Sequence, residues 1–367
     1  MFNIMDELAG RGIKTIAILA SRKNMEERLA KSGENIEYIF APFNSMRIRF
    51  ENCSRKNYCR YFINKLKNKH QAVKLARILR NKNIDIVHIN GLDSEIGALI
   101  ARKLNVPYVW HIRQFLDEDF SMKLYAQKKT YRLVKKSAAV IGISKAVQEK
   151  YEKELKIPMM LIYNGIPIER YQIKKERILY GETVKILLAG RIIPYKGQMT
   201  AVKAIGILVK SGINTVKLTL VGETGRTGFL RQLKDYINEN GLEDNVAIMD
   251  HADNLRELRT EHDICLVCST KEAFGRVTIE GMLSSQLVIG ANSGGTAEII
   301  QHGDNGLLYS PGDENDLYQK LIYTLTHKDE MNRIARKGYK HACEKYSIKR
   351  VADELLSVYN IITGKRG

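Results

Sequence analysis

Two glutamates with a defined spacing stand in the second half of the chain, in the segment TKEAFGRVTIEGM (residues 270–282). Seven residues separate Glu272 from Glu280, and a Phe-Gly pair lies between them. An apolar run of strand length, residues 263–268, precedes the segment, and apolar residues at near-helical spacing follow it. This order predicts a strand, a loop and the start of a helix, which in an open α/β sheet is a crevice where ligands bind.

The spacing of the two carboxylates indicates what kind of ligand could reach both. We expect Glu272 in the loop above the crevice and Glu280 two turns into the helix. One ligand that touches both must be long, with a polar group at each end, and a nucleotide-sugar has that shape. Free N–H groups at Phe274 and Gly275, at the helix start, favour an anion between the two ends. The alternative is an exposed loop acid and an acid on a solvated helix face.

Two cations follow another apolar run in the same half of the chain. Gly190 and Arg191 close the run VKILLAGR, and Lys196 and Gly197 follow after four intervening residues. A strand that ends in glycine, followed by two cations and a second glycine at the start of a helix, is typical of an anion site. A surface turn with chance cations is the alternative.

Two glycine-rich segments, residues 221–228 and 292–296, also follow predicted strands. Ordinary turn chemistry explains the first nearly as well as ligand binding does. In the second, Gly294 and Gly295 either let one backbone approach another closely or cap a helix.

Two histidines end neighbouring predicted strands in the first half, His88 in DIVHIN and His111 in YVWHIRQF. A residue at the carboxyl end of a parallel strand faces the crevice, so we expect a functional role for His111, with a core position as the alternative. For His88 a structural position is favoured.

Composition restricts the class of protein. A chain of 367 residues predicts two domains, and 44% hydrophobic with 27% charged residues is usual for a soluble globular protein. Apolar runs stay short of the roughly 18 to 20 residues that span a bilayer, and the N-terminus does not resemble a signal peptide. The five cysteines, at irregular spacing, indicate reduced thiols and a cytoplasmic protein.

The positive charge is concentrated in the first half. Residues 1–180 hold 35 Lys and Arg against 18 Asp and Glu, and residues 181–367 hold 24 against 23. Residues 47–82 interleave aromatic residues with cations, which favours an interfacial position on anionic lipid. The alternative is a solvated helix with its aromatic residues in the core. Nucleic-acid binding is not favoured, because no recognised module accompanies the charge.

Apolar runs alternate with helical patterns along the whole chain, which predicts two sets of parallel βαβ units. A polar linker is expected within residues 167–181, and a mostly helical tail from residue 313. The predicted strands are residues 14–20, 36–42, 85–90, 108–113, 138–144, 160–164, 184–190, 216–222, 245–250, 263–269, 287–292 and 306–309. The first half opens on a helix, so we expect a strand and Gly-rich turn upstream, roughly 15 to 25 residues, or an incomplete fold.

The motifs GR-x4-KG (residues 190–197) and E-AFGRVTI-E (residues 272–280) together resemble those of the retaining glycosyltransferases of family 4. The resemblance runs from about residue 3 to the C-terminus. It implies the GT-B fold, with two facing Rossmann-like domains. The expected parts are an N-terminal domain that faces the acceptor and the membrane (1–170), a linker (171–182), a nucleotide-sugar domain (183–345) and a C-terminal helix that packs back on the first domain (346–367).

The resemblance also implies roles for individual residues. Glu280 would bind the ribose hydroxyls and Glu272 the hydroxyls of the donor sugar. Arg191 and Lys196 would neutralise the diphosphate as it leaves, because cleavage of the anomeric bond puts negative charge there. His111 would face the donor sugar. The other expected donor contacts are Phe274, Gly275, Gly190, Arg276 and Asn164.

The resemblance implies an enzyme that moves a sugar from a nucleotide-diphosphate-sugar to an acceptor, without a metal or other cofactor. The basic aromatic segment, residues 47–82, favours a peripheral position on the inner face of the cell membrane and a glycan or polyprenyl-linked acceptor. Residues 117–119, Asp-Glu-Asp, are not expected to bind metal. Cys265 and Cys268 are expected to be buried structural thiols, since they would face opposite sides of a strand. The family's N-terminal Gly-rich loop has no counterpart here. A non-catalytic GT-B subunit of a glycosylation complex is therefore one alternative. A soluble, sugar-phosphate-using GT-B enzyme with no membrane role is another.

Overall fold

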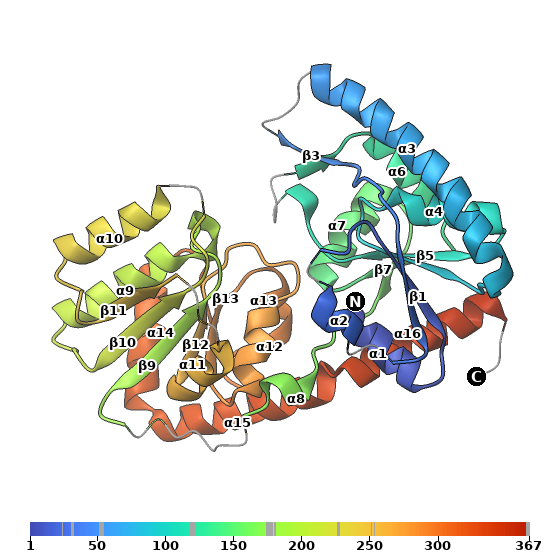
Figure 1. The fold of residues 1–367 in the computed structure, drawn as a ribbon. Coiled ribbons are helices and arrows are strands. Elements are labelled where there is room, and N and C mark those ends of the chain that lie inside the picture. The colour runs from blue at the N-terminus through green and yellow to red at the C-terminus, as the bar shows by residue number, and fades with distance from the viewer. Residues whose placement is uncertain are drawn as a thin grey trace. The chain divides into compact units, whose positions relative to one another are not determined.

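The computed structural model describes residues 1–23, 25–30, 33–50, 55–117, 122–173, 179, 181–225, 228–250, 252 and 254–364. The chain forms two compact units (Figure 1), one of residues 1–166 with 348–367 and one of residues 167–347. Residues 118–119, parts of the predicted linker and residues 226–227 lie outside the described residues, as do the side chains of Arg55, Lys56 and Tyr58.

The described residues of the second unit form one parallel sheet of six strands in the order β11-β10-β9-β12-β13-β14. The strands are β9 (Val184–Ala189), β10 (Val216–Val221), β11 (Val246–Met249), β12 (Ile264–Val267), β13 (Leu287–Ala291) and β14 (Leu307–Tyr309). The helices are α8 (Ile168–Tyr171), α9 (Gln198–Lys210), α10 (Phe229–Glu239), α11 (Leu255–Glu261), α12 (Arg276–Leu283), α13 (Gly294–Ile299), α14 (Glu314–Thr326) and α15 (Lys328–Lys345).

The direction of winding reverses between β9 and β12. From β9 the chain proceeds to β10 and β11 on one side, and from β12 to β13 and β14 on the other. Helices cover both faces, so every residue of β12 and β13 is buried. The loops that leave the carboxyl ends of β9 and β12 therefore meet at the point where ligands bind in open α/β sheets.

Among its described residues, the first unit contains two parallel sheets and one short antiparallel pair. The strands are β1 (Thr15–Leu19) with β2 (Ile36–Phe40), then β4 (Val87–Asn90), β5 (Tyr108–Ile112), β7 (Ala139–Gly142) and β8 (Met160–Leu161), and the antiparallel pair β3 (Arg47–Arg49) and β6 (Met122–Leu124). The helices are α1 (Phe2–Gly10), α2 (Glu26–Ala30), α3 (Arg55–Leu79), α4 (Glu95–Leu104), α6 (Gln127–Val134), α7 (Lys145–Leu155) and α16 (Ile348–Thr363).

Helices connect the two parallel sheets of this unit. On one face, Ile16 and Ile18 of β1 belong to the apolar cluster of α3 and α4, and α4 also packs on β4. On the other face, α1 contributes to the clusters of both sheets, with Met5 beside Ala17 and Ile4 beside Val109. In the part of the chain that the structure describes, the β1–β2 ladder ends at β1 and a separate ladder begins at β4.

Helix α16 returns the chain to the first unit. Its apolar stripe, with Val351 and Leu355, packs against Val109 of β5 and Ile141 of β7. This stripe recurs every three or four residues, the spacing that keeps side chains on one helix face.

The predicted fold class is confirmed, because every predicted strand has a counterpart within a few residues of its expected ends. The pair β3 and β6 was not predicted. Across the described ranges, no helix is both long enough and apolar enough to cross a bilayer.

Candidate active site

The loops after β9 and β12 contact each other through their backbones. Thr270 donates from its N–H to the carbonyl of Tyr195 at 3.1 Å. At Gly197, which has a φ of +73°, a Cβ would lie 2.2 Å from the carbonyl oxygen of Cys268. Glycine is thus required at this position for both its conformation and its lack of a side chain.

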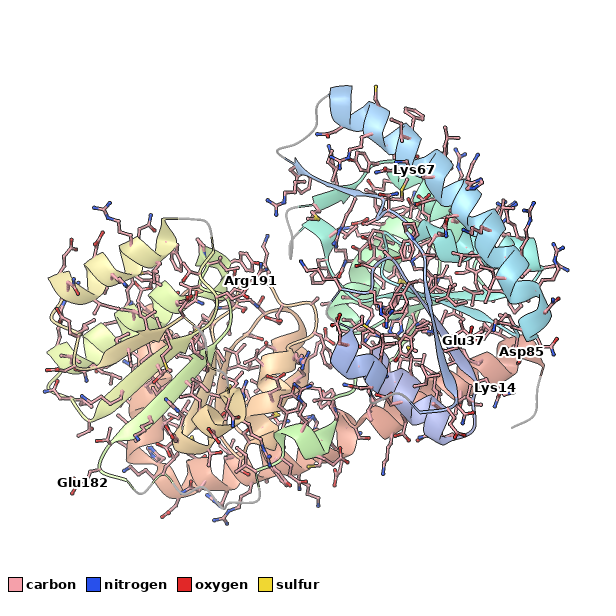
Figure 2. All side chains as sticks on the ribbon, in the orientation of Figure 1. Lys14, Glu37, Lys67, Asp85, Glu182 and Arg191 are labelled. Carbon is pink, nitrogen blue, oxygen red and sulfur yellow. The ribbon has the colours of Figure 1, made fainter. Side chains whose placement is uncertain are left out.

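A lysine and a glutamate join these two loops. The Nζ atom of Lys196 lies 2.9 Å from Oε2 of Glu272, and the two side chains are 22% and 18% exposed. The structure therefore brings together the predicted diphosphate-binding cation and the predicted sugar-binding acid. Arg191 is exposed at the end of β9 (Figure 2) and donates to the Tyr195 hydroxyl at 3.2 Å. Gly190, beside it, has a φ of +156°.

The loop after β13 also contacts the loop that carries Glu272, through the backbone of both. Gly295 donates from its N–H to the carbonyl of Glu272 at 2.8 Å, and a Cβ at Gly295 would lie 2.3 Å from the carbonyl oxygen of Phe274. A Cβ at Gly294 would lie 2.4 Å from the Glu272 carbonyl oxygen. Of the two alternatives for these glycines, close backbone approach is the one that the structure shows.

Helix α12 begins at the end of this loop. Gly275 is its N-cap residue, with a φ of +84°, and Phe274 is buried with its ring centroid 6.1 Å from that of Tyr346. The first N–H groups of a helix have no partner within it, and they carry partial positive charge. The start of α12 can therefore take an anion beside Lys196.

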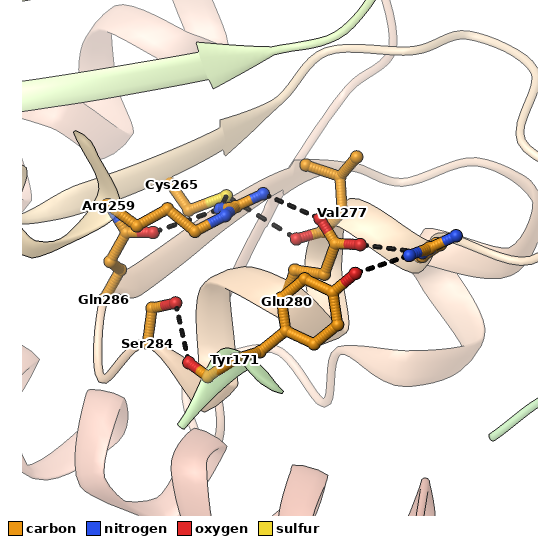
Figure 3. Close-up of polar contacts among 8 residues, drawn as sticks. Tyr171, Arg259, Cys265, Val277, Glu280, Ser284 and Gln286 are labelled. Atoms are coloured by element: carbon orange, nitrogen blue, oxygen red, sulfur yellow. Dashed lines mark hydrogen bonds and ion pairs between the residues drawn. The ribbon is translucent and has the colours of Figure 1, made fainter. Parts of the chain in front are cut away.

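Glu280 lies just over one turn into α12, closer to the helix start than the two turns predicted. It is only 6% exposed, so the solvated-face alternative is wrong. Oε2 accepts a hydrogen bond from Arg259 Nη2 at 3.0 Å, and Oε1 accepts one from Arg276 Nε at 2.7 Å (Figure 3). Arg276 Nη2 also donates to the Tyr171 hydroxyl at 2.5 Å. Each carboxylate oxygen has a second lone pair, which remains able to accept from a ligand hydroxyl.

Arg259 was not predicted from the sequence, although it is the most completely buried partner of Glu280, at 1% exposed. Its Nη1 atom donates to Gln286 at 3.3 Å and approaches Cys265 Sγ at 3.7 Å. The helix α11 that carries it follows β11, but the residues between them include no glycine and its sequence LRELRTE gives no signal of a site. Tyr171, on α8, was also missed.

The remaining predicted residues lie in the first unit. His111 is fully buried, and its Nδ1 lies 3.2 Å from Nε2 of His88. His88 Nδ1 lies 2.6 Å from the hydroxyl of Tyr359 on α16. Asn164 accepts a hydrogen bond from Arg113. Burial lowers the pKa of Arg113 to about 10.

The two cysteines and Asp117, the described member of the acidic triplet, make structural contacts. Cys265 and Cys268 are buried, and burial raises the pKa of the Cys268 thiol to about 12. Asp117 forms an ion pair with Lys150 at 2.6 Å, and its neighbours Glu118 and Asp119 lie outside the described residues.

Two parallel α/β units, with a lysine–glutamate pair and a buried glutamate at the switch point of the second, define a protein of the GT-B glycosyltransferase class. Comparison with solved structures agrees: Anabaena HepE in complex with UDP superposes with a TM-score of 0.78 at 19% identity, over 98% of this chain and 96% of that one. Residues 2–170 match the family model Glycosyltransferase Family 4, and residues 169–341 match the model Glycosyl transferases group 1. The chain therefore belongs to the glycosyltransferases whose two halves these models describe.

Two curated relatives are similar over large parts of the chain. The N-acetyl-alpha-D-glucosaminyl L-malate synthase of Bacillus anthracis is 24% identical, over 78% of this chain and 77% of the relative. The capsular polysaccharide biosynthesis glycosyltransferase CapM of Staphylococcus aureus is 25% identical, over 60% of this chain and 61% of the relative.

Proposed function

We propose that the protein is a retaining glycosyltransferase that moves a sugar from a nucleotide-diphosphate-sugar to a glycan or polyprenyl-linked acceptor, in the synthesis of a cell-surface polysaccharide. The observation that carries this proposal is the arrangement of Lys196, Glu272 and Glu280 around the start of α12. It offers two hydroxyl-binding carboxylates with a cation and free helix N–H groups between them. HepE has been solved with UDP-glucose, and CapM is a capsular polysaccharide enzyme, which supports the donor class and the pathway.

Each group has a task in the proposed reaction. Glu280, held by two guanidinium groups, accepts the ribose hydroxyls, and Glu272 accepts hydroxyls of the sugar. Lys196 and the first N–H groups of α12 stabilise the negative charge that develops on the leaving diphosphate, with Arg191 assisting. These fixed charges take the place of a metal ion, so the transfer is proposed to be metal-independent. Retention would follow from attack on the same face of the sugar from which the diphosphate leaves.

A screen of nucleotide-sugars tests the donor assignment. Binding and hydrolysis of UDP-, GDP- and dTDP-sugars would be measured with excess EDTA, for the wild type and for Glu280→Gln and Lys196→Met. The matched controls are Glu239→Gln and Lys234→Met, which change exposed residues of α10. We expect one donor class to be bound and hydrolysed, with binding weakened by Glu280→Gln. Equal binding by Glu280→Gln would contradict the ribose assignment, and binding without turnover would favour the non-catalytic alternative.

We also propose that the first unit binds the anionic inner face of the cell membrane through α3. Three apolar side chains of this helix face solvent, with Phe62 56%, Ile63 52% and Leu66 65% exposed. Phe50, 48% exposed, has the Nζ of Lys123 5.8 Å from its ring centroid. By contrast, Tyr61 of the same basic segment is buried. Exposed apolar residues surrounded by cations are typical of an interfacial helix.

The charges around α3 favour an anionic surface. Desolvation, together with the nearby ammonium of Lys65, lowers the pKa of Lys129 to about 8. A bound anion would relieve this crowding of like charges. Lys67, labelled in Figure 2, and Lys69 are exposed on the same helix.

Liposome sedimentation tests the membrane proposal. We expect binding to vesicles with anionic lipid at low salt, and weaker binding at high salt. Phe62→Ser/Leu66→Ser should reduce binding, whereas Ile361→Ser, which removes a 78% exposed apolar side chain of α16, should not. No binding at low salt would contradict the proposal and favour a soluble enzyme.

A further inference from the structure

Three aromatic side chains form a hydrogen-bonded chain inside the first unit. The hydroxyl of Tyr359 lies 2.6 Å from Nδ1 of His88, and Nε2 of His88 lies 3.2 Å from Nδ1 of His111. The two imidazole centroids are 5.2 Å apart, and the Tyr359 ring stands at 83° to that of His88. The chain therefore connects α16 to strands β4 and β5 through three polar side chains.

The strand register places both histidines on one face of the sheet. His88 is paired with Val109 in the β4–β5 ladder, and His111 is two residues beyond Val109. Residues two apart in a strand point to the same side. Helix α16 packs on this side, against Val109 itself, which brings Tyr359 within reach of His88.

All three side chains are neutral at ordinary pH. Burial lowers the pKa of His88 to about 3, and burial together with the charge of Arg113 holds the pKa of His111 well below its usual value. Burial raises the pKa of the Tyr359 phenol. Each imidazole therefore carries one proton, and its position is set by the hydrogen bonds that its two nitrogens make.

The phenol determines the order of protons along the chain. Within the described residues, the one hydrogen-bond partner found for the Tyr359 hydroxyl is His88 Nδ1. Tyr359 must donate there, because a buried O–H without an acceptor is costly. His88 then carries its proton on Nε2 and donates to Nδ1 of His111, so His111 carries its own proton on Nε2. The opposite order would leave the phenol proton without an acceptor.

We propose that Tyr359 is a positioning residue that, through His88, fixes His111 as a hydrogen-bond donor at Nε2. This atom is buried and has no hydrogen-bond partner among the described residues. An oxygen atom of a bound ligand would supply the missing acceptor, and His111 would meet it as a donor and not as a base. The inference rests on the proposed function in one respect, namely that the oxygen belongs to the transferred sugar or its diphosphate.

The position of the proton can be measured directly. In protein with ¹⁵N-labelled histidine, two-bond ¹H–¹⁵N spectra distinguish the two tautomers, and the His111 signal is assigned by its loss in His111→Gln. We expect the Nε2–H tautomer in the wild type, and a mixture of tautomers in Tyr359→Phe. The matched control is Tyr323→Phe, beside His327 on the surface of α14, where the ring centroids are 4.0 Å apart. This change should leave His111 as it was.

Two outcomes would overturn the inference: a wild-type His111 protonated on Nδ1, or an unchanged tautomer in Tyr359→Phe. The wild-type spectrum decides the first even if the variant does not fold. A separate kinetic measurement tests the link to transfer, since loss of one ordered hydrogen bond should lower kcat about tenfold in Tyr359→Phe. A shifted tautomer with unchanged kcat would retain the hydrogen-bonded chain and reject His111 as a donor-sugar contact.

Discussion

Arg259 donates to Glu280 at 3.0 Å inside the second unit, and the two side chains are only 1% and 8% exposed. A charge this deeply buried is tolerated because its partner neutralises it and because Gln286 takes a further hydrogen bond. Arg259 touches the carboxylate from the interior, whereas Arg276, whose side chain is 61% exposed, touches it from the solvent side. Glu280 is thus oriented before any ligand arrives.

Removal of Arg259 should destabilise the protein and weaken donor binding together. Arg259→Met leaves Glu280 buried with one partner fewer, and we expect the free energy of unfolding to fall by about 3 kcal/mol. The double variant Arg259→Met/Glu280→Gln should recover part of this loss, because the uncompensated charge is gone. Urea unfolding of the four proteins measures the coupling. Simple additivity of the two losses would show that the pair is not coupled.

Lys196→Met should affect turnover far more than stability. Its ion pair with Glu272 is partly exposed, and such pairs contribute up to about 1 kcal/mol to folding. Loss of a cation at the leaving diphosphate should lower kcat by a factor of about 10² to 10³. Donor hydrolysis and thermal unfolding would be compared with Lys234→Met. A large drop in melting temperature with unchanged kcat would assign Lys196 a structural role only.

Alanine substitutions at two glycines should distinguish the cost of a strained backbone from the cost of a steric clash. Gly197 and Gly212 both have a positive φ, of +73° and +85°, but a Cβ at Gly212 would meet no atom within 4 Å, whereas one at Gly197 would meet Cys268. Gly212→Ala should therefore cost about 1 kcal/mol of unfolding free energy. Gly197→Ala should cost about 3 kcal/mol and abolish donor binding, because the loops after β9 and β12 must separate. Equal losses in denaturant titrations would refute a close approach.

Stability should fall in acid because of the buried histidines. The pKa of His88 is about 3 in the folded protein and near 6.5 when unfolded, so the unfolded chain binds more protons between these values. Stability is then greatest above pH 6.5 and decreases as the pH falls toward 3, by up to about 1.4 kcal/mol per pH unit for this group. Urea unfolding from pH 7 to 4 should show a shallower slope for His88→Gln. His70→Gln, an exposed histidine of α3, should keep the wild-type slope.

The sequence was sufficient to predict the parallel strands and the site residues that belong to short sequence motifs. Buried parallel strands are continuous apolar runs, and Lys196, Glu272 and Glu280 each stand at a fixed distance from the end of one. The pair β3 and β6 was missed because RIR and MKL are too short to show alternation.

The supporting side chains could not be predicted in the same way. Arg259 and Tyr359 act through contacts with residues 21 and 271 positions away, which no local spacing records. In α3, Tyr61 is buried and the adjacent Phe62 is exposed. Their difference depends on the rotation of the helix on the sheet, which composition does not reveal.

Because the ladders of the first unit are separate, one edge of β4 and one edge of β1 have backbone amides that no ladder hydrogen bond of the described chain protects. Val87 and Gly91 direct their N–H groups to β5, so His88 and Asn90 direct theirs to the other edge of β4. Thr15 likewise bonds to the β2 side, which leaves the amides of Ile16 and Ile18 on the opposite edge of β1. In the described part of the chain that edge carries no ladder. Transferred to heavy water, these amides should take up deuterium well before those of β12 and β13, because no ladder hydrogen bond of the described chain protects them.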